Sequence, residues 1–64
     1  MKYRVASVRR EREEGRGNIL LADLVNEDGT IVMKGTLAHV IQTCEARAYE
    51  VINIEQAKIA LSRQ

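Results

Sequence analysis

The sequence predicts a small α+β domain in which a three-stranded antiparallel meander precedes an amphipathic helix, a fourth strand and a short C-terminal helix. In the first half, apolar or alternating segments are separated by glycine-containing turns, which is typical of strands. The second half changes to apolar residues spaced three and four apart, which indicates a helix. Since the chain has 64 residues and lacks Phe and Trp, we expect a single domain with an aliphatic core.

The first strand is expected at residues 3–8, which mix β-branched and small residues with arginines. Residues 9–13 extend this strand as a charged arm. A loop should follow at residues 14–18, because Gly15 and Gly17 can both supply the positive φ that a turn requires.

Residues 19–25 give the strongest strand pattern of the chain, Ile-Leu-Leu-Ala-Asp-Leu-Val. Asp28 and Gly29 then predict a hairpin turn in which the glycine adopts the left-handed conformation. The turn leads back into a partner strand at residues 30–34, so that residues 1–34 form the meander.

A helix is predicted over residues 36–48, with the side chain of Thr36 as its N-cap. One apolar stripe should pack this helix on the meander, and it comprises Leu37, Val40, Ile41, Cys44 and Ala48.

The last part of the chain allows two interpretations. Residues 49–54 alternate and are β-branched, which predicts a fourth strand. Residues 55–63 contain good helix formers, and Asn53 with Gln56 resembles a capping box, so a C-terminal helix is preferred. A strand stays the alternative, because Ala57, Ile59 and Leu61 also alternate with polar or small residues.

Both faces of the central strand are apolar, because side chains alternate along residues 19–25. The chain's own helix can cover one face, and a chain of this size has little left to cover the other. We therefore expect a homo-oligomer, with a dimer favoured, whose interface comprises Leu20, Ala22, Leu24 and Ile59.

The basic side chains gather near the N-terminus, where residues 1–16 hold six basic and three acidic side chains and carry a net charge of +3. The second functional hypothesis is therefore a nucleic-acid-binding protein, whose arginines contact the phosphate backbone. The candidate contacts are Arg4, Arg9, Arg10, Arg12 and Arg16. The competing interpretation is an edge strand with solvated charges, which discourages aggregation.

Other chemistry-bearing residues have simpler interpretations. The two glycines around Arg16 lack the Lys-Ser/Thr ending of a phosphate loop, and we read them as a turn. His39 has no carboxylate one helical turn away and should be an exposed helix residue. Cys44 lies in the apolar stripe and should be buried and inert. Asp23 interrupts an apolar strand, so it should meet an arginine such as Arg4 or lie at a wet edge.

Composition excludes several classes of function. One Cys and one His cannot form a disulfide or a four-ligand zinc site within the chain, and no cofactor is expected. No apolar run is long enough to cross a bilayer, and no signal-peptide core is present, so we expect a cytoplasmic protein. The leading hypothesis is a non-catalytic interaction module or small regulatory protein that acts as a homo-oligomer.

Overall fold

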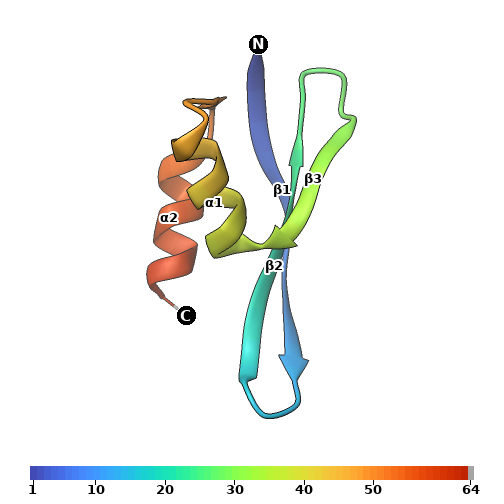
Figure 1. Ribbon diagram of the computed structural model, residues 1–64, viewed down its shortest axis with the longest axis vertical. Helices are drawn as coiled ribbons and strands as arrows, with labels where there is room; N and C mark the ends of the chain where they lie inside the picture. Colours follow the sequence, from blue (N-terminus) through green and yellow to red (C-terminus); the bar gives the residue numbers. More distant parts are fainter. Residues whose placement is uncertain (64) are drawn as a thin grey trace.

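The computed structural model describes residues 1–63 and shows a four-stranded mixed sheet with helices on one face (Figure 1). The elements follow in the predicted order β-β-β-α-β-α, which confirms the α+β fold: β1 (Lys2–Glu13), β2 (Gly17–Val25), β3 (Ile31–Thr36), α1 (Leu37–Ala46), β4 (Glu50–Val51) and α2 (Ile54–Ser62). The strand order is β3-β2-β1-β4. Neighbours are antiparallel except for β4, which runs parallel to β1.

Both predicted turns of the meander are confirmed. Gly15 and Gly17 have φ of 83° and 76° in the turn between β1 and β2, where a side chain would be strained. Gly29 has φ of 83° in the turn before β3. The Asn26 side chain closes that turn by accepting hydrogen bonds from the backbone N–H groups of Asp28 and Thr30, both at 3.0 Å.

A β-bulge in β1 reverses the alternation of its side chains, and the sequence pattern did not predict it. Ala6 pairs with Asp23, but the next pair is Arg9 with Leu21, so Ser7 and Val8 together oppose one residue of β2. Ser7 adopts a left-handed φ of 54° to make the bulge. As a result Val5 and Arg10, five residues apart, point to the same face of the sheet.

The core lies between the sheet and the two helices. The predicted stripe of α1 packs there through Leu37, Val40, Ile41 and Cys44, and the Thr36 hydroxyl accepts a hydrogen bond from the His39 N–H at 3.1 Å as its N-cap. Ala48 does not belong to the stripe, contrary to expectation. It lies beyond the helix with φ of 56°, in the left-handed position that ends the helix.

The expected oligomer interface is wrong for three of its four residues. Leu20, Ala22 and Leu24 are 8%, 0% and 0% exposed within the single chain, because the helices pack on the face of β2 that carries them. They are not available to a second subunit. Ile59 alone of that set is open, with 49% of its surface exposed.

The fourth strand is shorter than predicted, and a side chain continues its pairing. Only Glu50 and Val51 pair with β1. Two residues later, the Asn53 side-chain amide donates to the Val5 carbonyl and accepts from the Val5 N–H, each at 2.9 Å. Asn53 therefore bonds to β1 as a backbone peptide would.

The C-terminal segment is a helix, which resolves the alternative in favour of α2. The expected capping box is absent, because Asn53 makes no side-chain hydrogen bond to the first turn of α2. Its amide is already engaged by Val5. Within residues 1–63, no helix is long and apolar enough to cross a membrane.

Replacing Asn53 by Ala should destabilise the fold by about 2 kcal/mol, since two hydrogen bonds are lost and Val5, which is 4% exposed, keeps unpaired backbone groups. Urea unfolding followed by circular dichroism measures this change. Gln56→Ala is the matched control, and its effect should stay below about 0.5 kcal/mol because Gln56 is exposed. Equal costs for the two variants would contradict the role assigned to Asn53.

Candidate functional site

The connected ends of β1 and β2 form a two-stranded ribbon that projects beyond the rest of the sheet. We call residues 10–20 the projecting ribbon. β3 pairs with β2 only as far as Leu21, and β4 pairs with β1 only at Lys2 and Tyr3, so the ribbon has no third strand. In Figure 1 it extends past the ends of both helices. A two-stranded ribbon is marginally stable alone, so an exposed one suits contact with a partner.

The register of the ribbon separates its charges by face. Arg10 pairs with Leu20 and Arg12 with Asn18, so both arginines point to the side of the sheet that carries the helices. Glu11 and Glu13 point to the opposite, helix-free side. The interleaved glutamates, which weaken the nucleic-acid hypothesis when the sequence is read linearly, therefore do not share a face with these two arginines.

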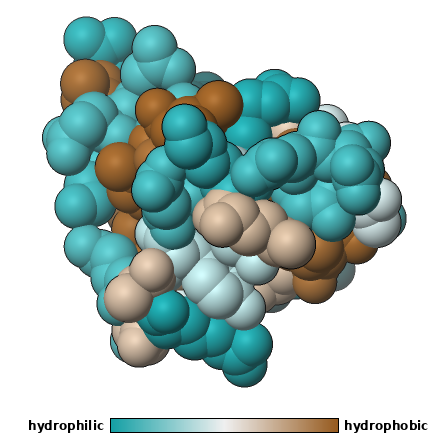
Figure 2. Space-filling view, turned by 90° about the horizontal axis from the view of Figure 1, so that it is seen from above, coloured by the Kyte–Doolittle hydropathy of each residue, from teal (hydrophilic) through white to brown (hydrophobic). Residues whose placement is uncertain are grey.

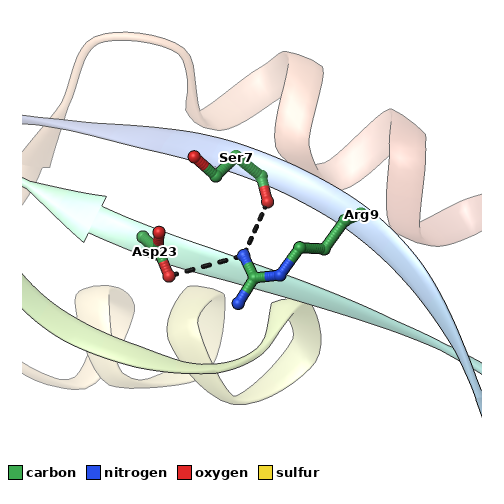
Figure 3. Close-up of polar contacts among 3 residues, drawn as sticks. All are labelled: Ser7, Arg9 and Asp23. Carbon is green, nitrogen blue, oxygen red and sulfur yellow. Dashed lines mark hydrogen bonds and ion pairs between the residues drawn. The ribbon is translucent and has the colours of Figure 1, made fainter.

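The helix-free face holds an ion pair close to the bulge (Figure 3). Arg9 Nη1 lies 3.5 Å from Asp23 Oδ1 and donates to the Ser7 carbonyl at 2.8 Å. The Asp23 side chain is 10% exposed and that of Arg9 is 41% exposed. Asp23 thus meets an arginine across the sheet as expected, but the partner is Arg9 and not Arg4, because the bulge brings Arg9 onto this face.

The five candidate arginines do not form one cluster. Arg9 is bound to Asp23, and Arg16 forms an ion pair with Glu13 at 3.5 Å in the turn. Arg4 lies at the far end of β1, opposite Val25, on the helix-free face. Arg10 and Arg12 remain together on one exposed face, and neither forms an ion pair with any residue of the described chain.

The basic face of the ribbon continues into a corner beneath the helices. A depression of about 220 Å³ lies there, and its lining includes Leu20 at the base of the ribbon, Ala38 of α1 and Leu61 of α2. The ribbon and the helices therefore form an angled surface with Arg10 and Arg12 on its projecting side.

The remaining candidates lie where the sequence analysis expects them. The segment Gly15 to Gly17 is a turn between two strands and precedes no helix. His39 is exposed on α1. Cys44 is a free thiol that is 1% exposed, and burial together with the Glu45 carboxylate raises its pKa, which keeps it protonated and unreactive. Among residues 1–63, no three His, Cys, Asp or Glu side chains are grouped to hold a metal ion.

Comparison of the chain with protein-family models, with curated proteins and with solved structures finds no match. Its function must therefore be inferred from its own residues and their geometry.

The raised pKa of Cys44 predicts a loss of stability at alkaline pH. The unfolded thiol ionises near pH 8.5 while the folded one keeps its proton, so the stabilisation is complete below that pH and declines above it. The slope from this group should reach at most roughly 1.4 kcal/mol per pH unit. Urea unfolding of the wild type and of Cys44→Ala at several alkaline pH values isolates the effect. Parallel pH profiles for the two proteins would refute it.

Proposed function

We propose that this protein is a non-catalytic binding module that contacts the phosphate backbone of nucleic acid with its projecting ribbon. The observation that carries the proposal is the separation of charge on the ribbon, which leaves Arg10 and Arg12 on one face, without an ion pair to any carboxylate of residues 1–63. Guanidinium groups bind phosphate through paired, charge-assisted hydrogen bonds. Exposed arginines on a projecting element are therefore suited to phosphate contact.

The shape of the ribbon supports the same proposal. A two-stranded antiparallel ribbon fits the major groove of duplex DNA, and its basic face can follow a strand of phosphates. The binding expected from two arginines is weak and insensitive to base sequence, because phosphate contacts position a protein without reading bases. The chain's small net charge of +1 agrees with a contact confined to this one surface.

Replacing Arg10 and Arg12 together by Gln should abolish most binding to a fluorescent DNA duplex, measured by anisotropy over a range of salt concentrations. For the wild type, the logarithm of the binding constant should fall with the logarithm of salt concentration with a slope of about −2, as expected for two phosphate contacts. The double variant should reduce that slope by about 2, one for each lost phosphate contact.

A matched control removes two positive charges elsewhere. Lys2 and Lys58 each form a surface ion pair, with Glu50 and Glu45, so their joint replacement by Gln should leave both the affinity and the fold almost unchanged. Equal losses in the two double variants would show that only net charge matters. No retention of the wild type at low salt would overturn the proposal.

We also propose a second function, self-association through the helix-free face of the sheet. Ile19 and Leu21 on this face are only partly buried, and Ile31, which pairs with Val25 further along the same face, is 45% exposed. The charges on the face differ between its two ends. Arg4 and Lys34 lie at the end where β3 pairs with β2, and Glu11 and Glu13 lie at the other end, on the ribbon.

A two-fold axis near Leu21 would place the basic end of one copy over the acidic end of the other, which is the self-complementarity that a symmetric dimer needs. Such a dimer would also carry two basic ribbons. This face needs less cover from a second subunit than the sequence predicts, because Asp23 and Val25 on it are already only 7% and 6% exposed in one chain.

Light scattering tests self-association, and a mass of two 7.2 kDa chains is expected for the wild type. Ile31→Glu should shift this mass to that of one chain, because Ile31 lies at the basic end of the face, where the added carboxylate would oppose the partner's Glu11 and the partner's Glu13. Ile52→Glu is the matched control, since Ile52 is 63% exposed and flanks β4 on the far edge of the sheet. A single-chain mass for the wild type at high concentration would exclude the dimer.

We place the protein in the cytoplasm as part of this proposal. Its sole cysteine is a buried free thiol, and a chain without disulfides is suited to a reducing compartment.

A further inference from the structure

At the opposite end of the molecule from the ribbon, α1 and β3 diverge (Figure 1). A second concave surface lies there, lined by residues of both elements. This α1/β3 cleft has a volume of about 430 Å³. Its lining comprises Tyr3, Leu24, Val32, Met33, His39, Thr43, Arg47 and Tyr49. The volume lies in the range of sites that hold small organic ligands.

One wall of the cleft is a row of hydrogen-bond donors on α1. His39 and Thr43 lie in α1 and Arg47 is its C-cap residue. The three follow each other at intervals of four residues, so they lie on one flank of the helix and its end. This flank is set by the buried stripe of α1, which turns Val40, Ile41 and Cys44 into the core. No Asp or Glu lines the cleft, so the donors are not neutralised by a neighbouring carboxylate there.

The guanidinium of Arg47 is held at the cleft by an aromatic residue. Arg47 Nη1 donates to the Tyr49 hydroxyl at 3.3 Å, and the guanidinium is charged at any physiological pH. The Tyr49 ring is itself stacked on that of Tyr3, with the ring centroids 4.5 Å apart. The positive charge therefore has a defined position beside an aromatic surface.

The other wall of the cleft is apolar and incompletely covered. Val32 is the extra residue of a bulge in β3, since Met33 pairs with Leu24 while Ile31 pairs with Val25. The bulge leaves Val32 47% exposed at the cleft. Figure 2 views the molecule from this end and shows brown apolar groups separated by teal hydrophilic ones, with no single large apolar patch.

We propose that the α1/β3 cleft binds a small amphipathic oxyanion, a carboxylate or phosphate group attached to a short apolar body. The anionic group would accept hydrogen bonds from Arg47, Thr43 and His39, while the apolar body would lie against Val32, Met33 and the tyrosine pair. A neutral ligand would form no ion pair with Arg47, so an anion should bind more tightly. This site is separate from the ribbon, so ligand binding in the cleft does not depend on nucleic-acid binding.

Three probes with six carbon atoms each test the proposal: hexanoate, hexyl phosphate and the neutral hexanamide. Each is titrated into the full chain at constant ionic strength while backbone amide shifts are followed by nuclear magnetic resonance. Hexanoate or hexyl phosphate should shift the amides of Val32, His39, Thr43 and Arg47, with an affinity about tenfold above that of hexanamide. The tighter of the two anions identifies the headgroup.

Variants separate a specific contact from general charge. Arg47→Gln should lower the affinity for the anion about tenfold and leave hexanamide binding unchanged. Lys58→Gln, which removes a positive charge from α2 outside the cleft, should leave all three affinities unchanged. Equal affinity for anion and amide, shifts confined to the ribbon, or no loss in Arg47→Gln would each overturn the proposal.

Discussion

The bulge at Ser7 and Val8 is the constraint on which the arrangement of the sheet depends. Before it, β1 turns Val5 into the core, and after it the strand continues as an exposed ribbon with Arg10 on the same face. Strict alternation from Val5 would have put Glu11 and Glu13 on the helix side instead. The bulge also brings Arg9 onto the face of Asp23, so a carboxylate inside an apolar strand gains a partner. One irregular backbone step therefore determines both the packing and the charge of each face.

The Asn53 amide attaches the start of the last helix to the sheet. β4 contributes only two residues to the parallel ladder, too few to fix α2 by backbone pairing. The Ile52 N–H bonds to the Tyr3 carbonyl at 2.9 Å, and Asn53 then extends the contact to Val5 through its side chain. Because side-chain pairing needs fewer residues than a strand, α2 can begin at once and cover the core with Ala57, which is 4% exposed.

Sequence periodicity predicted the regular elements because each obeys a local rule. The glycine turns, the Thr36 cap and the α1 stripe depend on residues within one turn or one strand of each other. The ion pair of Asp23 with Arg9 and the pairing of Asn53 with Val5 join residues 14 and 48 positions apart, and no local pattern encodes them. The choice of Leu20, Ala22 and Leu24 as an outer face failed for the same reason, since two equally apolar faces of a strand look alike until the helix is placed.

The projecting ribbon and the α1/β3 cleft each lie beside a departure from regular strand geometry. The bulge in β1 places Arg10 and Arg12 on an open face, and the bulge in β3 exposes Val32 to the cleft. In a regular four-stranded sheet of this size, the side chains would form one core face and one solvated face. A bulge changes the face to which the following side chains point, and the strand pairing continues on either side of it. A small fold can therefore place exposed side chains at its two ends while its centre stays packed. The left-handed Ser7, strained for a residue with a side chain, is consistent with this balance, because strain of this kind persists only where the surrounding structure holds it.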